Sequence, residues 1–354
     1  MTTLQQMTRH AGEWLRGAGP HSEIVISSRI RLARNLAGYP FVGHANRRQH
    51  IDLLARCREQ VMSRRLADGM LWVNLPDSPP LDRQLLVERH LISRQHANAN
   101  DDLPRAVAIG TDETFAIMVN EEDHLRIQVL RSGMQLTEAF AQVDRIDNML
   151  EEKLNFAYSR RFGYVTACPT NVGTGIRVSV MLHLPALRLT GEIEKVRRAA
   201  RDMHLAVRGL FGEGSDAVGD LYQISNQATL GKSEQEIVAD FEKTVAPMII
   251  AYEQQARQAL LQHRQAQLDD KVWRAWAVLK HARVMGTEEV LALLSQLRLG
   301  LNLGRLDSVN IRTINELFQL TQPAHLQKLT NREMDAATRR IARAGLIRQR
   351  LSKR

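Results

Sequence analysis

Two arginines stand two positions apart in the stretch ISSRIRLARN, residues 26–35. If this stretch is a strand, its side chains alternate between two faces, so Arg29 and Arg31 share one face while Ile30 and Leu32 share the other. The stretch contains no acidic residue that would neutralise the two arginines. Because guanidinium groups match phosphate oxygens bidentately, the pattern predicts that this face binds an anion that carries phosphate groups.

Two later stretches have the same design, with arginine on one face of a predicted strand and aliphatic residues on the other. Their polar faces carry Glu122, His124, Arg126 and Gln128 in residues 120–129, and Arg177, Ser179 and His183 in residues 176–184. Such strands cover a core on one side and face water on the other. One strand of this kind is common without a ligand, but three in one chain favour a polyanion site, and a triphosphate is the leading candidate.

Conventional phosphate-binding loops do not account for such a site. Gly231, Lys232 and Ser233 resemble the end of a Walker A motif, but Asn226 stands where that motif requires its first glycine. Ser233 and Glu236 fit better as a capping box that opens a helix. A nucleotide site in this chain is therefore expected to be built from arginine side chains.

A glycine-rich segment, residues 208–220, surrounds the acidic residue Glu213. Glycine permits unusual backbone dihedrals, as a loop that closes over a substrate requires. A plain surface loop with an incidental glutamate explains the same residues, so both interpretations stay open.

The composition is that of a globular protein, with 44% of the 354 residues hydrophobic and 25% charged. The first residues lack the apolar run of a signal peptide, and no window approaches the roughly 20 apolar residues of a membrane-spanning helix. We therefore expect no membrane association. The two cysteines, Cys57 and Cys168, lack CxxC spacing, which argues against a disulfide framework or a zinc site and favours a reducing cytoplasm.

The net charge of +9 is concentrated near the C-terminus. Residues 257–354 carry 18 basic and 8 acidic residues, whereas residues 1–256 carry 30 basic and 31 acidic residues. This asymmetry predicts a domain boundary near residue 256. It fits either a nucleic-acid or acidic protein partner for the basic part, or simply a solvated basic helical face.

The spacing of apolar residues predicts an order of elements. Helices are expected at residues 46–67, with Ile51, Leu54, Val61 and Met62 facing the core, and at 81–95, 135–156, from a Thr190 cap to about 207, and from 234. Strands are expected at residues 105–109, 114–119, 123–131 and 176–184. After residue 256 the pattern is helical, and Trp273 and Trp276 are expected to pack.

Several of these stretches together resemble the signatures of one family. The stretches are, in chain order, SSRIRLAR, NEEDHLRIQ, CPTNVGTGIR, RGLFGEG and GDLYQISNQATLGKSE, within residues 24–240. They are similar to the motifs of the ATP:guanidino phosphotransferases, the phosphagen kinase family. Within it, the chain most resembles the bacterial protein-arginine kinases of the McsB type, because only 26 residues precede Ser27 and a helical extension follows residue 256.

The resemblance implies an α+β fold. An antiparallel sheet flanked by helices would form the catalytic domain, residues 20–256. An all-helical, basic C-terminal domain, residues 257–354, would serve dimerisation or regulation.

The resemblance also implies roles for individual residues. The ATP phosphates would be bound by Arg29, Arg31, Arg126, Arg177 and Arg208. His90 would lie against the adenine, Glu122 and Glu213 would hold the substrate guanidinium, and Cys168 would sit beside it. Mg²⁺ would be held largely by phosphates and water, with no protein residues assigned as metal ligands.

The chemistry agrees with these roles. A guanidinium keeps its proton at neutral pH and is a poor nucleophile. Two carboxylates can orient it, and one can accept a proton as the N–P bond forms. Arginines offset charge on the transferring phosphoryl group. Cys168, near a turn and arginines, is either a reactive thiolate or a packed thiol.

We therefore expect a kinase that transfers the γ-phosphoryl group of ATP to arginine side chains of proteins. Two alternatives stay open: a kinase of a free small guanidine such as arginine, and a non-catalytic protein that binds phosphoarginine or nucleic acid. Nucleic acid is the less expected partner. By resemblance, we also expect marking of proteins for Clp-type proteolysis in the stress response, an McsA-type activator, a homodimer and a cytoplasmic location.

One motif departs from the McsB type, in which an RDxxRA stretch binds phosphoarginine. Here the stretch is RRIARA, and Arg340 stands at the position of the aspartate. Arg339 and Arg343 remain candidate contacts for a phosphate, but the like charge of Arg340 disfavours recognition of a guanidinium.

Overall fold

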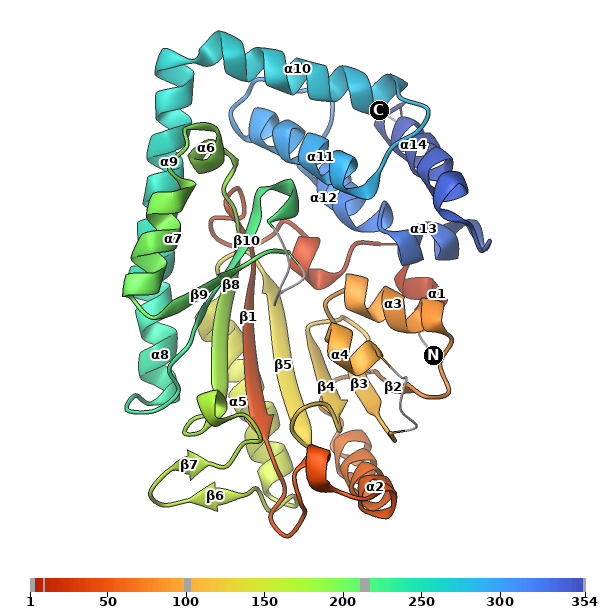
Figure 1. The fold of residues 1–354 in the computed structure, drawn as a ribbon, viewed down its shortest axis with the longest axis vertical. Helices are drawn as coiled ribbons and strands as arrows, with labels where there is room; N and C mark the ends of the chain where they lie inside the picture. Colours follow the sequence, from red (N-terminus) through yellow and green to blue (C-terminus); the bar gives the residue numbers. More distant parts are fainter. Residues whose placement is uncertain (1–3, 9, 99–102, 211–216, 353–354) are drawn as a thin grey trace.

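The protein was analysed as a computed structural model that describes residues 4–8, 10–98, 103–210 and 217–352. Within these residues, an eight-stranded sheet with the order β2-β3-β4-β5-β1-β8-β10-β9 lies at the centre of the molecule (Figure 1). Every neighbouring pair in it is antiparallel. The strands are β1 (Val25–Arg34), β2 (Met70–Asn74), β3 (Ala106–Gly110), β4 (Phe115–Val119), β5 (Leu125–Ser132), β8 (Ile176–His183), β9 (Leu205–Arg208) and β10 (Leu221–Asn226). A two-stranded sheet is formed by β6 (Tyr158–Ser159) and β7 (Gly163–Tyr164).

Helices surround the sheet and form the C-terminal part of the chain. Those within and beside the sheet region are α1 (Leu4–Met7), α2 (Arg47–Ser63), α3 (Pro80–Glu88), α4 (Arg94–Ala97), α5 (Leu136–Glu151), α6 (Pro185–Leu189), α7 (Ile193–Asp202) and α8 (Glu234–Asp240). The later helices are α9 (Ala246–His263), α10 (Gln265–His281), α11 (Thr287–Asn302), α12 (Ile311–Leu320), α13 (Pro323–Thr330) and α14 (Ala336–Ser352). The predicted antiparallel sheet flanked by helices, followed by a helical region, is confirmed. No helix in the described ranges is long and apolar enough to cross a membrane.

The two faces of the central strands differ in chemistry, as their period of two requires. Ile30 and Leu32 of β1 are fully buried and belong to the main hydrophobic core. Helix α5 covers this apolar face and packs against β1 and β5. The opposite face carries Arg29 and Arg31, which are partly buried. One face therefore holds the fold together while the other is left for polar chemistry.

The C-terminal helices are joined to the sheet region by a continuous helix and by buried polar contacts. Residue 256 lies inside α9, which continues α8 through a π-helical turn at Phe241–Val245. From α11, the Arg298 guanidinium donates to the Glu23 carbonyl at 2.9 Å and contacts Nδ1 of His183 at 2.9 Å. The two parts of the chain are thus packed together, although their charge balance differs.

Some local predictions were wrong. Thr190 does not begin a helix that runs to residue 207; it ends α6, where its hydroxyl donates to the Ala186 carbonyl at 3.0 Å. Helix α7 stops at Asp202, and residues 205–208 form β9 because tertiary pairing with β10 overrides helical periodicity. The predicted helix at 81–95 is interrupted at His90, whose φ is 59°.

The apolar stripe of the predicted helix 46–67 was only partly right, since Val61 is buried and Leu54 packs against the core as predicted. Helix α2 buries His50, Leu53, Cys57 and Val61, while Ile51 is half exposed. The core face is therefore rotated by about one residue from the predicted stripe. Cys57 is a fully buried residue of the main core.

The predicted packing of the tryptophans holds for Trp276 only. Trp276 packs against the main core, whereas Trp273 on the same helix is half exposed. A helical stripe read from sequence does not reveal which flank of a helix faces water.

Candidate active site

Strand register gathers five arginines on one face of the sheet. In β1, Arg31 stands opposite Arg177 of β8 and Gln128 of β5. Arg126 lies two pairs further along β5, opposite Ala33, and so on the same face as Gln128. Arg208 reaches the same face from β9, through its pairing with Gln223 of β10. Residues from four strands, distant in sequence, therefore point into one region of the surface.

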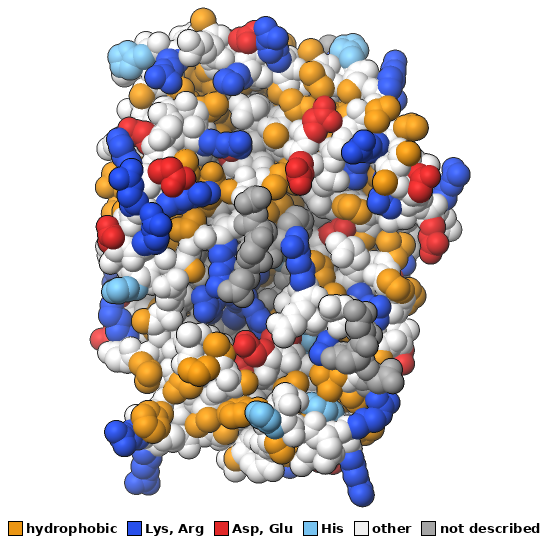
Figure 2. Space-filling model, in the orientation of Figure 1, with side chains coloured by type: hydrophobic (Ala, Val, Ile, Leu, Met, Phe, Trp, Pro, Cys, Tyr) orange, Lys and Arg blue, Asp and Glu red, His pale blue; other side chains and the backbone are white. Residues whose placement is uncertain are grey.

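Two adjoining cavities lie over this face. The first, of about 280 Å³, is lined by Arg29, Arg31, His90, Arg126 and Arg208. The second, of about 480 Å³, holds Glu122, Cys168 and Arg177 and shares Arg31, Arg126 and Arg208 with the first. Figure 2 shows basic side chains gathered in a hollow near the middle of this face. The shared arginines form the boundary between the two cavities.

The arginine cluster is electrostatically strained. Burial, followed by the charges of Arg126, Arg177 and Arg208, lowers the pKa of Arg29 to about 9. Burial and the neighbouring arginines also lower the pKa of Arg31 well below its usual value. Nε of Arg31 is buried and has no hydrogen-bond partner in the described structure. A bound polyanion would supply this partner and the missing countercharge, and a triphosphate fits both requirements.

Glu121 is a functional candidate that the sequence interpretation missed. Its carboxylate accepts two hydrogen bonds from Arg126, at 2.8 and 2.9 Å, one from Ser93 at 2.6 Å and one from the Glu122 backbone at 2.9 Å. Burial opposes ionisation, but the charge of Arg126 and these hydrogen bonds lower the pKa of Glu121 to about 2. Glu121 therefore holds Arg126 in place as a permanent anion. The signal in the sequence was its position beside Glu122.

His90 occupies a rigid position in the first cavity. Its left-handed backbone conformation ends α3, and Nε2 of Gln128 donates to its carbonyl at 2.8 Å. The Trp14 ring packs edge-on against the imidazole, with centroids 4.4 Å apart. Burial and the nearby charges of Arg29 and Arg94 lower the pKa of His90 to about 3. The ring is therefore neutral, which suits contact with an uncharged aromatic base.

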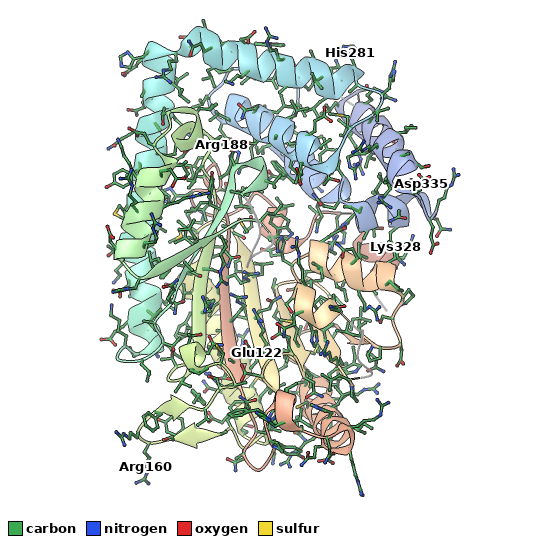
Figure 3. The ribbon with its side chains drawn as sticks, viewed as in Figure 1. Glu122, Arg160, Arg188, His281, Lys328 and Asp335 are labelled. Carbon is green, nitrogen blue, oxygen red and sulfur yellow. The ribbon has the colours of Figure 1, made fainter. Side chains whose placement is uncertain are left out.

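Glu122 and Cys168 lie in the second cavity. Glu122 is exposed and lies just before β5, in the lower half of the sheet (Figure 3). Cys168 precedes a short turn, and its Sγ lies 3.0 Å from Oγ1 of Thr170. Asp123 joins the two segments, because it accepts hydrogen bonds from Asn35 at 2.6 Å and from the Ala167 backbone at 2.7 Å. Asp123 is a second positioning residue that the sequence interpretation missed.

The remaining predicted residues fall elsewhere. Glu213 lies outside the described residues. His124, predicted on the polar face, instead accepts from the Leu36 backbone at 2.9 Å and contacts the Pro40 carbonyl at 2.8 Å. It is buried in the turn before β5, because the strand begins at Leu125 rather than at residue 123.

The two candidate phosphoarginine contacts lie far along the chain, on α14. The Arg343 guanidinium is buried and donates to the carbonyls of Thr321 at 2.8 Å and Met285 at 2.9 Å. Arg339 donates to the Met334 carbonyl at 2.7 Å. In this structure both side chains bind backbone carbonyls.

The described residues include no cluster of three or more histidine, cysteine or acidic side chains that could hold a metal ion. Mg²⁺ commonly binds through substrate phosphates and water with only one or two carboxylates. The residues present therefore fit a magnesium ion that arrives with a nucleotide better than a resident metal.

Comparison with known families and proteins agrees with this geometry. Residues 57–256 match the family described as ATP:guanido phosphotransferase, C-terminal catalytic domain. Residues 265–354 match the family described as protein-arginine kinase McsB C-terminal domain.

Curated relatives match over nearly the full length. The protein-arginine kinase of Symbiobacterium thermophilum is 47% identical over 349 residues, which cover 98% of each chain. The protein-arginine kinase of Halothermothrix orenii is 44% identical over 352 residues, which cover 99% of this chain and all of the relative.

Solved structures of two guanidino kinases have a similar fold over about 70% of this chain. Lombricine kinase is 27% identical with a TM-score of 0.58, covering 69% of this chain and 71% of that chain. The duplicated taurocyamine kinase from Schistosoma mansoni, solved with bound transition-state-analogue components, is 25% identical with a TM-score of 0.58. It matches 70% of this chain and 35% of its own length.

Proposed function

The chain belongs to the ATP:guanido phosphotransferase family, and from this premise we propose how it works as a protein-arginine kinase. As such an enzyme, it transfers a phosphoryl group from ATP to arginine side chains of proteins. The observation that carries the proposed site is the five-arginine face, in which Nε of Arg31 has no partner among the described residues, beside the cavity of Glu122.

The first cavity is proposed to bind the nucleotide. Arg29, Arg31, Arg126, Arg177 and Arg208 would bind the phosphates, and the neutral His90 ring would lie against the adenine. The repulsion among the arginines in the ligand-free state is relieved when the triphosphate enters. Glu121 keeps Arg126 oriented throughout. Binding and charge stabilisation therefore come from the same side chains.

The second cavity is proposed to hold the target guanidinium. Glu122 would orient it by charge-assisted hydrogen bonds, with Glu213 as the second carboxylate and Cys168 beside it. As the guanidinium nitrogen attacks, an N–P bond forms, the bond from the γ-phosphorus to the β-bridging oxygen breaks, and ADP leaves. A glutamate accepts the proton that the nitrogen releases. Holding both substrates in line across the shared arginines supplies much of the acceleration.

Mg²⁺ is proposed to enter with ATP, held by phosphate oxygens and water. When bound, it offsets charge on the phosphates during transfer. Glu122 would be a candidate to contact its water shell, since it lines the second cavity beside the arginines.

Wider roles follow from the same family as proposals. Residues 20–256 would form the catalytic domain and residues 257–354 a regulatory and dimerisation domain. A homodimer formed through residues 257–354 is part of the same proposal. We further propose that the enzyme acts in the cytoplasm with an McsA-type activator and that its marks direct proteins to Clp-type proteolysis under stress.

A labelling experiment tests the proposed site. The chain is incubated with γ-labelled ATP, Mg²⁺ and a denatured test protein rich in arginine. The label on protein should be acid-labile, as a P–N bond is, and Glu122→Gln should lower its rate by at least about 100-fold. Free arginine is assayed in parallel, because rapid turnover there without protein labelling would favour a small-guanidine kinase.

A matched control separates chemistry from folding. Glu138→Gln makes the same change on an exposed residue of α5, which covers the opposite face of the sheet, and should keep the wild-type rate. An acid-stable label only, or an unchanged rate in Glu122→Gln, would overturn the proposal.

A further inference from the structure

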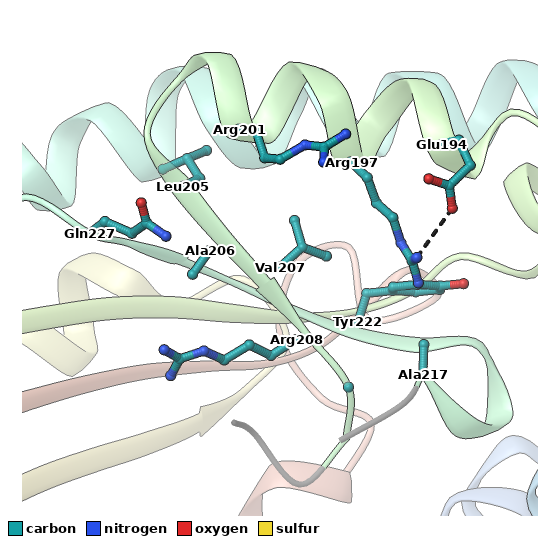
Figure 4. A pocket seen from close by; sticks show the side chains of 11 residues that line it. Glu194, Arg197, Arg201, Leu205, Ala206, Val207, Arg208, Ala217, Tyr222 and Gln227 are labelled. Atoms are coloured by element: carbon teal, nitrogen blue, oxygen red, sulfur yellow. Dashed lines mark ion pairs between the residues drawn. The ribbon is translucent and has the colours of Figure 1, made fainter. Parts of the chain in front are cut away.

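A third cavity opens beside the proposed active site, between α7 and the end of the sheet. It has a volume of about 530 Å³ and is lined by α7, by all of β9, and by Tyr222 of β10 (Figure 4). Arg208 and Gln227 line both this groove and the cavity that holds Glu122 and Cys168. The groove therefore begins where the proposed guanidinium site ends.

The wall formed by α7 is basic. Glu194, Arg197 and Arg201 stand at positions i, i+3 and i+7, so they share one face of the helix, and all three line the groove. Arg197 pairs with Glu194 at 3.1 Å and lies over the Tyr222 ring at 5.7 Å. Arg201 is exposed and, within the described ranges, forms no ion pair. The face thus has an excess of positive charge toward the groove.

The floor of the groove is formed by the strand at the edge of the sheet. Strand β9 is last in the sheet order and, among the described strands, pairs only with β10. In an antiparallel ladder, alternate residues of an edge strand point their backbone N–H and C=O groups outward. An extended peptide can pair with such an edge as an additional strand, while its side chains enter pockets on alternate sides. Val207 and Tyr222 provide apolar surface for those side chains.

We propose that this groove binds the extended segment of the protein substrate beside the target arginine, and that acidic side chains of that segment meet Arg197 and Arg201. The inference rests on the proposed function, since it names how a polypeptide is held at that site. A free small guanidine has no polypeptide chain to bind. In a protein substrate, the chain on either side of the target arginine must extend out of the guanidinium cavity along the surface of the enzyme. The groove continues from the guanidinium cavity, and it offers the backbone of β9 for pairing with an extended chain and the arginines of α7 for binding acidic side chains.

Peptide kinetics test the charge part of the inference. Three peptides share one arginine and differ in flanking residues, which are aspartate, asparagine or lysine. The wild type should prefer the aspartate peptide, and the double variant R197E/R201E should lower its kcat/KM by at least about fivefold, mainly through KM. The same variant should favour the lysine peptide and leave the KM for ATP unchanged.

Arg198→Glu is the matched control. Arg198 is an exposed residue of the same helix that does not line the groove. This variant should keep the wild-type order of peptides. If R197E/R201E also keeps that order, or if the wild type phosphorylates all three equally, the inference is wrong while the kinase activity stands. If the wild type phosphorylates none of them and no protein, the proposed function itself fails.

Backbone methylation tests the strand-edge part. A series of aspartate peptides, each N-methylated at one amide, removes one hydrogen-bond donor at a time. Pairing with β9 predicts that methylation weakens phosphorylation at every second position on one side of the arginine. An equal effect at all positions, or no effect at any, would contradict strand addition.

Discussion

Arg31 and Arg34 lie on the same strand, yet their surroundings are opposite. The Arg34 guanidinium is buried between two acids, with Nη2 at 2.7 Å from Asp147 and 3.1 Å from Glu234. Burial alone would lower its pKa, but the two carboxylates outweigh burial and raise the pKa of Arg34. Arg31 has other arginines around it and a lowered pKa. One site is complete in the folded chain, and the other is completed by a ligand.

The same contrast holds for other buried arginines. Arg89 is fully buried against Glu113, and Arg257 pairs with Glu253 at 2.9 Å. Arg89 joins α3's C-terminal end to Glu113, whereas Arg257 and Glu253 lie on the same helix, α9, and Glu253 also accepts hydrogen bonds from the backbone of α6. A buried arginine with an acid partner therefore indicates structure, whereas a cluster that lacks enough acids indicates an anion-binding function.

Removing a cluster arginine should have the largest effect on activity. Arg31→Met is expected to lower kcat/KM for protein phosphorylation by about 1,000-fold, because charge on the transferring group loses its partner. The same variant should raise the free energy of unfolding of the ligand-free protein by roughly 0.5–1 kcal/mol, since repulsion is relieved. Initial rates and urea unfolding check both. Unchanged activity, or a clear loss of stability, would contradict the claim that Arg31 serves ligand binding whereas Arg34 serves stability.

Removing the paired arginine should have the reverse signature. Arg34→Met leaves Asp147 and Glu234 buried without a cation and should destabilise the protein by about 3–5 kcal/mol. The fraction that remains folded should keep the wild-type KM for ATP, because Arg34 does not line either proposed substrate cavity. A stable Arg34→Met protein with a strongly raised KM for ATP would contradict this assignment.

Glu121→Gln should have an intermediate effect. The amide keeps some hydrogen bonding to Arg126 but not the charge, so the KM for ATP is expected to rise about tenfold. The control is Glu152→Gln, which alters an exposed partner of Arg64 and should leave the KM for ATP and stability nearly unchanged. Equal effects of the two variants would show that Glu121 has no positioning role.

The smallest effect should appear in the pH dependence of stability. The pKa of Arg29 is lowered to about 9 in the folded protein, well below its ordinary value, so the folded state releases this proton first as pH rises. The cost of the buried charge is fully present below pH 9 and is relieved as the pH rises above 9. The stability gain of Arg29→Met over the wild type should therefore shrink from pH 8 to pH 10.5. A gain that grows over this range would have the wrong sign.

The sequence predicted the arginine face well, because a period of two is a property of any strand. Arg29, Arg31 and Arg177 lie on the face that alternation requires. Glu121 escaped prediction because it precedes β5, where Asn120 adopts a left-handed conformation and alternation no longer applies. Asp123 was not predicted because its partners, Asn35 and Ala167, come from loops that are distant in sequence.

The failures in secondary structure have a similar cause. Residues 205–207 were predicted as the end of a helix, but their pairing with β10 is a long-range contact that local periodicity does not contain. The groove along β9 could not be predicted from the sequence for the same reason. The local sequence pattern thus predicts the polar and apolar faces of each helix and strand, whereas tertiary contacts determine which of these faces pack against each other.

Calorimetric titration with Mg·ATP, inorganic triphosphate and adenosine tests the central claim most directly, that the arginine face is completed by a triphosphate. The wild type should bind ATP and triphosphate at one competitive site and adenosine far more weakly. Arg31→Met should lose most of the affinity for both phosphate ligands. Adenosine binding as tightly as ATP, or Arg31→Met binding ATP with wild-type affinity, would contradict the account.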